Sequence, residues 1–124
     1  MKTAKSEGKY AYDGLERVFH EKTRLSIIAS LFASRKGRDF NELKALCGLT
    51  DGNLSRHLQV LKAEGIIKIR KGYINNKPNT HCSITGEGRE KFSQYLEELE
   101  KVIKDAKAVA MQSEGFEEGL APAT

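Results

Sequence analysis

The segment "LTDGNLSRHLQVLKAEG", residues 49–65, decides the expected fold of this 124-residue chain. Thr50 can cap a helix and Gly65 can end it. One face of that helix is apolar and is formed by Leu54, Leu58 and Leu61. Its first turn nevertheless carries Gly52 and Asn53, where helix stability alone favours alanine or glutamate. The sequence therefore raises the question of what approaches this end of the helix.

The opposite face of the same helix is polar and small. It presents Gly52, Arg56 and Gln59, with Asn53 and Ser55 on its flanks. A helix N-terminus that enters the major groove of DNA needs small residues for close approach. It also needs Asn, Arg, Ser and Gln side chains to reach base edges and phosphates. A merely solvated face would more often carry Glu and Lys throughout, so this face indicates DNA contact.

A second helix is expected just before this segment, in "DFNELKALCG". Asp39 and Glu42 form a capping box and Gly48 ends the helix. Leu43 and Leu46 are expected to face inward. The short "GLT" connection then makes a helix-turn-helix. Further upstream, an apolar stripe begins at Leu15, Val18 and Phe19 and repeats at Leu25, Ile28, Leu31 and Phe32, with "HEKTR" between the two parts bending or breaking the helix.

Residues 66–85 change from helical to alternating periodicity. Ile67 and Ile69 alternate with polar residues, "NNKPN" is rich in turn formers, and "THCSI" returns as a second strand. The sequence therefore predicts a β-hairpin wing. Its candidate contacts to phosphates or to the minor groove are Lys71, Lys77 and the asparagines at 75, 76 and 79. A lysine at a hairpin tip equally serves solubility.

A long helix is predicted from Thr85, and its apolar residues follow a heptad seam. The seam comprises Phe92, Leu96, Leu99, Ile103, Ala106 and Ala110, and a second stripe is formed by Tyr95, Val102 and Val109. One helix with two apolar stripes is expected to pack both on its own domain and on a second copy. The predicted dimer interface is therefore Phe92, Leu96, Leu99, Ile103 and Ala106.

Charge is unevenly distributed along the chain, whose formal net charge is +4. Residues 55–85 hold six basic groups against Glu64 alone, whereas residues 86–124 hold five basic and nine acidic groups. This pattern indicates a polyanion-facing element on a scaffold that does not bind the polyanion. With no apolar run of the ~18 residues a membrane span needs, no secretory signal, and only Cys47 and Cys82, a cytoplasmic protein in a reducing compartment is expected.

Three other functions were weighed. Metal sensing lacks a ligand set, because Cys47 stands alone and His81 and Cys82 point to opposite faces of a strand. Cys47 and His57 are expected to be packed rather than to bind metal, and His20 has no evident partner. No glycine-rich phosphate loop, nucleophile elbow or paired carboxylates indicate an enzyme. A winged-helix protein-interaction module is the main alternative, although a protein-binding face has no reason to exclude acidic residues as this one does.

Two stretches, "LTDGNLSRHLQVLKAEGII" and "KPNTHCSITGEGRE", resemble winged helix-turn-helix regulators related to the MarR and ArsR groups, especially their small single-domain members. The matching positions are Leu49, Thr50, Gly52, Asn53, Leu54, Ser55, His57 and Leu58, with "FHEKTRLSII" and Pro78-x-Thr80. The resemblance covers residues 13–110. It implies a homodimer, usually a repressor, with the second motif helix in the major groove and the wing over the backbone or minor groove.

The chain departs from that family at "TGEG", where an acidic pair is usual before the glycine. Gly86 and Gly88 should each weaken the helix start by about 1 kcal/mol relative to alanine, which suggests a looser hinge.

The expected fold is mostly α with a small β-hairpin wing and a long C-terminal dimerisation helix. We expect an arm at 1–12, disordered or partly ordered, the DNA-binding domain at 13–84, the dimerisation helix at 85–112 and a flexible tail at 113–124. The expected function is sequence-specific binding of duplex DNA as a homodimer that regulates transcription as a repressor, without cofactor or metal, and with a small-molecule effector left open. The expected DNA contacts are Thr50, Gly52, Asn53, Ser55, Arg56, Gln59, Lys62, Lys71, Asn76 and Lys77. Of these, Asn53, Arg56 and Gln59 are expected to read bases, and the lysines to contact phosphates.

Overall fold

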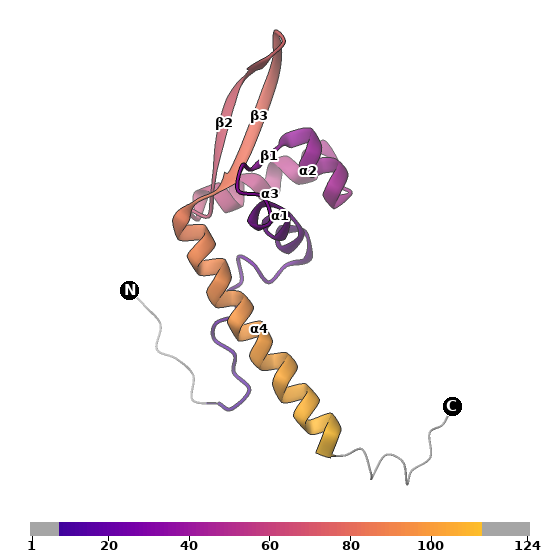
Figure 1. Cartoon of the computed structure of the whole chain (residues 1–124), viewed down its shortest axis with the longest axis vertical. Coiled ribbons are helices and arrows are strands. Elements are labelled where there is room, and N and C mark those ends of the chain that lie inside the picture. Colours follow the sequence, from indigo (N-terminus) through magenta and orange to yellow (C-terminus); the bar gives the residue numbers. More distant parts are fainter. Residues whose placement is uncertain (1–7, 113–124) are drawn as a thin grey trace, which may run out of the picture.

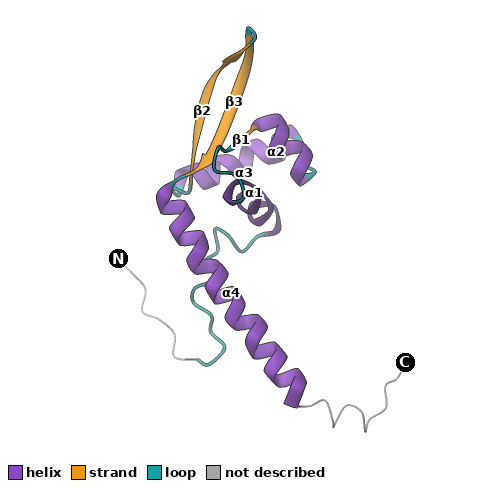
Figure 2. Cartoon of the chain, in the orientation of Figure 1, coloured by secondary structure: helices purple, strands orange, loops and turns teal. Residues whose placement is uncertain are grey.

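The computed structural model describes residues 8–112 and shows a winged helix fold (Figure 1). In chain order the elements are α1 (Lys22–Phe32), β1 (Arg38–Asp39), α2 (Phe40–Cys47), α3 (Asp51–Ala63), β2 (Ile67–Ile74), β3 (Lys77–Ile84) and α4 (Gly86–Gln112). The three short helices gather at the base of the hairpin, and α4 runs away from them (Figures 1 and 2). The predicted mostly α fold with a hairpin wing and a long last helix is confirmed. Residues 1–7 and the predicted tail at 113–124 lie outside the described residues.

Helix α3 is held by the core as its leucine spacing predicts. Leu54, Leu58 and Leu61 are buried together with apolar residues of α1, such as Ile28. The Thr50 hydroxyl caps the helix by accepting a hydrogen bond from the Asn53 backbone N–H at 3.2 Å. Beyond the last turn, Gly65 adopts a φ of +78°, a conformation that favours glycine.

Helix α2 has the expected caps but turns a different face inward. The Asp39 backbone N–H donates to Glu42 Oε1 at 3.2 Å, and Gly48 has a left-handed φ of +64°. Leu43 is buried, but Leu46 is 59% exposed, so its predicted inward orientation is wrong. Cys47, one turn after Leu43, packs against the core in its place.

The segment before α1 is irregular, which corrects the helical stripe expected at Leu15–Phe19. Helix α1 begins at Lys22, where the Glu21 side chain accepts a hydrogen bond from the Arg24 backbone N–H at 2.8 Å. The segment lies along α4 (Figure 1): the Tyr12 hydroxyl donates to Asp105 Oδ2 at 2.7 Å. His20, for which the sequence suggested no partner, has its Nδ1 2.8 Å from the Tyr95 hydroxyl.

The wing is an antiparallel hairpin closed by a two-residue turn. Asn75 and Asn76 have φ values of +53° and +64°, as a tight hairpin turn requires. The sheet order is β1-β3-β2, and β1 pairs only Arg38 with Cys82 and Asp39 with His81. The sequence did not predict β1. Beyond these pairs the hairpin projects from the body of the molecule (Figure 1).

The start of α4 packs closely on the domain rather than forming the looser hinge expected from its glycines. Gly88 is buried, and a Cβ on it would lie against the Ile66 carbonyl oxygen, far inside van der Waals contact. The Thr85 hydroxyl accepts a hydrogen bond from the Gly88 N–H at 2.8 Å and donates to the Gly65 carbonyl at 2.7 Å. A glycine is needed here for close approach, which offsets its low helix propensity.

Phe92 must be removed from the predicted dimer interface. It is 2% exposed and belongs to the protomer's own core. Its ring centroid lies 5.4 Å from that of Phe19 and 5.1 Å from that of Phe32, both in edge-on geometry. The irregular N-terminal segment delivers Phe19 to this site, and that is why the helical spacing alone did not reveal it.

Candidate nucleic-acid interface

The outward face of α3 carries every residue that the sequence assigned to it. Thr50, Gly52, Asn53, Ser55, Arg56, Gln59 and Lys62 are all exposed. A Cβ on Gly52 would meet nothing within 4 Å, so packing inside the protomer does not require a glycine there. An explanation from outside the protomer, such as close approach by a partner, accounts for the small residue. This answers the question raised by the first turn.

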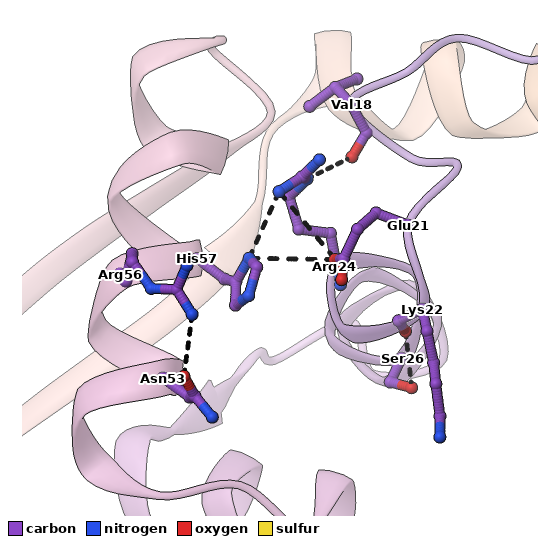
Figure 3. Close-up of polar contacts among 8 residues, drawn as sticks. All are labelled: Val18, Glu21, Lys22, Arg24, Ser26, Asn53, Arg56 and His57. Carbon is purple, nitrogen blue, oxygen red and sulfur yellow. Dashed lines mark hydrogen bonds and ion pairs between the residues drawn. The ribbon is translucent and has the colours of Figure 1, made fainter.

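Two of the predicted base-reading residues are joined to each other. The Arg56 guanidinium donates from Nη2 to Asn53 Oδ1 at 2.8 Å (Figure 3). This contact between residues three apart uses one acceptor of Asn53 and one donor group of Arg56, and both side chains retain further hydrogen-bonding groups. The pair therefore presents a preassembled set of donors at the N-terminal half of α3.

The acidic residue nearest that end of the helix is neutralised. Lys44 Nζ on α2 donates to Asp51 Oδ1 at 2.7 Å. Asp51 stands in the first turn of α3, where the helix dipole favours a negative charge. The lysine keeps this carboxylate from opposing a polyanion at the same helix end.

Behind the exposed face, His57 fixes α3 to α1. It is 7% exposed, and its Nδ1 lies 3.3 Å from Arg24 Nη1 (Figure 3). Because a guanidinium only donates hydrogen bonds, Nδ1 must accept, so the ring is neutral in this arrangement. Burial lowers the pKa of His57, and Glu21 raises it less than burial and the neighbouring arginines Arg56 and Arg24 lower it. The packed role expected for His57 agrees with this placement.

The same cluster ties the N-terminal segment to α1. Arg24 Nε donates to the Val18 carbonyl at 2.8 Å, and Glu21 Oε1 lies 3.9 Å from both Arg24 Nη1 and His57 Nδ1 (Figure 3). The hydrogen bond from the Arg24 backbone N–H is the main cause that lowers the pKa of Glu21. Sequence reasoning missed Glu21 and Arg24, since the contact between Arg24 and His57 joins residues 33 positions apart.

The wing supplies a second basic surface. Lys71, Asn76 and Lys77 are exposed, and so are Lys68 and Arg70, which alternate with Lys71 along β2. Lys68 and Arg70 were counted in the charge pattern but were not assigned to the site. Their strand alternation with Lys71 was the signal that both hairpin faces are basic. No acidic residue occurs between Glu64 and Glu87, so this surface and the end of α3 are uniformly positive.

A family model described as a winged helix DNA-binding domain matches residues 23–103. This chain belongs to the winged helix DNA-binding domain family. An uncharacterized protein of Methanocaldococcus jannaschii is 34% identical over 89 residues, which span 72% of this chain and 96% of that protein. A transcriptional regulator homologue from Pyrococcus horikoshii OT3 superposes with a TM-score of 0.71 at 28% identity, covering 80% of this chain and 98% of that chain. The M. tuberculosis transcriptional regulator MosR, solved in complex with DNA, has a TM-score of 0.60 at 23% identity, with 79% and 70% covered.

These likenesses confirm the predicted class. The winged helix protein is a DNA-binding regulator of transcription, and its structural neighbours are MarR-family regulators. Its family and fold are those of transcriptional regulators rather than of enzymes. Within residues 8–112, no three His, Cys, Asp or Glu side chains are grouped so that they could hold a metal ion. In the same range, no helix is long and apolar enough to cross a membrane.

The two cysteines are not activated thiols. Cys82 is buried in the core, and burial raises its pKa to about 11. Cys47 is half-buried, and burial raises its pKa as well. Both side chains are therefore protonated thiols at neutral pH, as the packed role expected of Cys47 requires.

Proposed function

We propose that this protein binds a pseudo-palindromic operator in duplex DNA as a homodimer and represses transcription. The single observation that supports this best is the exposed N-terminal half of α3. There, a glycine without a packing role stands beside the hydrogen-bonded Asn53 and Arg56. The DNA complex of the structurally similar MosR supports DNA as the partner of the same fold.

In this proposal the residues divide into base readers and phosphate contacts. Arg56 can form a bidentate pair with guanine, and Asn53 or Gln59 with adenine. Lys62, Lys71 and Lys77 carry flexible point charges suited to phosphates, with Asn76 at the wing tip beside them. Thr50, Gly52 and Ser55 allow the helix end to approach closely. Two copies related by a two-fold axis would occupy half-sites about 10 base pairs apart.

The proposed dimer surface is the apolar part of α4 that the protomer leaves exposed. Leu96 and Ile103 are exposed on this helix, and Leu99 is partly buried against the protomer's own core. With Ala106 they remain on one side of the helix after Phe92 is removed from the set. A second copy of the same helix offers a matching surface for them, because a two-fold interface uses the same patch twice.

The deciding experiment selects bound sequences from a random duplex library and then titrates salt with two variants. Arg56→Ala should cost roughly 1–3 kcal/mol per subunit on the selected operator and flatten the preference at one base pair per half-site. Lys77→Ala should weaken operator and scrambled duplex alike and lower the salt slope by about 1. An equal loss on both duplexes for Arg56→Ala would make Arg56 a phosphate clamp. No retention on any duplex at low salt would favour the protein-interaction module instead.

A further inference from the structure

His81 lies at the junction between the wing and the helix-turn-helix, with an oxygen at each ring nitrogen. Its Nδ1 is 2.8 Å from Asp39 Oδ1, and its Nε2 is 2.7 Å from the Lys36 carbonyl oxygen. A carboxylate and a carbonyl only accept hydrogen bonds, so both ring nitrogens must donate. A histidine donates from both nitrogens only as the imidazolium. The geometry therefore requires a charged His81, the reverse of the neutral His57.

The chain is shaped locally to accommodate this ring. Gly37 has a φ of +81°, and a Cβ on it would lie 2.7 Å from His81 Nε2 and even closer to the Cys82 carbonyl oxygen. Any other residue would displace the imidazole or the strand. The glycine before "RD" thus makes room for the contact between His81 and the Lys36 carbonyl.

The junction links three elements through few other bonds. Asp39 ends β1 and is the N-cap of α2, while His81 belongs to β3. Strand β1 contributes only two residue pairs to the sheet, so the side-chain bonds of His81 are a large part of what holds the wing base. Asn79 Nδ2 adds a longer hydrogen bond to Asp39 Oδ1 at 3.4 Å.

Two charged groups bear on His81, and they act in opposite directions. Asp39 on β1 stabilises the imidazolium, whereas Arg70, its cross-strand neighbour on β2, opposes it. The hydrogen bond to Asp39 is the main cause that raises the pKa of His81, and the bond to the Lys36 carbonyl adds to it. The hydrogen bond from His81 in turn holds the pKa of Asp39 below its usual value. The ion pair is thus favoured by both partners.

We propose that the contacts of His81 with Asp39 and the Lys36 carbonyl form a proton-dependent latch, which holds the wing against α2 and weakens operator binding when His81 loses its proton. Without the proton, one ring nitrogen presents a lone pair to an oxygen and the hairpin loses a charged bond at its base. The stabilisation is fully present below the unfolded pKa of about 6.5 and is lost as pH rises through the higher folded value. The affinity effect rests on the proposed function, because the wing must contact DNA for it to appear.

The first test follows the histidine ring signals of the full chain by NMR across pH. His81 should titrate above the ordinary histidine value and His57 below it. Asp39→Asn should lower the midpoint of His81 while preserving the start of α2, because asparagine is as good an N-cap as aspartate. The backbone heteronuclear NOE of residues 71–80 should fall through the same midpoint. A His81 that titrates at its ordinary value, or hairpin order that ignores its titration, would overturn the latch without any DNA measurement.

The second test measures affinity for the selected duplex at fixed salt from about pH 6 to 9, the range around the histidine pKa. Wild type should lose roughly fivefold or more in affinity, the lower range of typical couplings. Asp39→Asn should shift that midpoint down together with the midpoint of His81, and His81→Gln should remove the pH dependence. His20→Gln is the matched control and should retain it. An affinity midpoint that stays in place in Asp39→Asn would contradict the latch, whereas wild type that binds no duplex at any pH would contradict the proposed function alone.

Discussion

The two halves of α4 carry apolar residues at the same spacing but lie in different surroundings. In the first half, Phe92 and Tyr95 are buried with the N-terminal segment and α1 around them. In the second half, Ile103 is 48% exposed and Met111 is 73% exposed. The heptad pattern specifies that a face is apolar, but it does not specify what covers that face. The protomer supplies the cover for one half, and a second copy is our proposal for the other.

The sharpest way to break this comparison is to truncate one residue from each half. Phe92→Ala should cost about 3–5 kcal/mol of unfolding free energy, because it leaves a cavity among three aromatic rings. That loss should be the same at every protein concentration. Ile103→Ala should instead destabilise in a concentration-dependent way, because its cover comes from association. Urea denaturation at two protein concentrations measures both, and an equal, concentration-independent loss would place Ile103 in the protomer core.

The next test introduces a charge into the half that the protomer leaves uncovered. Ile103→Glu should give monomers, since a buried unpaired carboxylate costs more than the truncation of an apolar side chain. Lys104→Glu changes the neighbouring exposed residue and should leave the dimer intact. Sedimentation at about 10 µM and above compares the two variants with wild type. A wild type that is monomeric there would refute the proposed homodimer.

Local signals were sufficient to predict α3, its caps and the hairpin. The leucines of α3 keep helical spacing over three turns, and the cap at Thr50 and the stop at Gly65 act within a few residues. The polar face of α3 followed from the same periodicity, and its exposure agrees with that prediction. Periodicity and capping are properties of neighbouring residues, so the sequence displays them directly.

Long-range contacts explain what the sequence did not reveal. Strand β1 has two residues, too few for any period, and it forms only because β3 returns 42 residues later to pair with it. The N-terminal segment remains irregular because it packs along α4, where Gly14 lies against the Glu98 side chain. The same limit hid the anchor from Arg24 to His57 and the latch at His81, since each joins residues distant in sequence.

The smallest and most selective test uses the two glycines at the start of α4, which the sequence could not distinguish. Gly88→Ala should destabilise by about 1–3 kcal/mol, because its Cβ meets the Ile66 backbone carbonyl, which cannot rotate away. Gly86→Ala should stabilise by about 0.5–1 kcal/mol, since a Cβ there meets nothing within 4 Å and alanine favours the helix. Thermal denaturation of the two single variants gives both signs in one experiment. If both substitutions stabilised the fold, the close approach of α4 to Ile66 would be wrong, and with it the account of how the first half of α4 is held by its own domain.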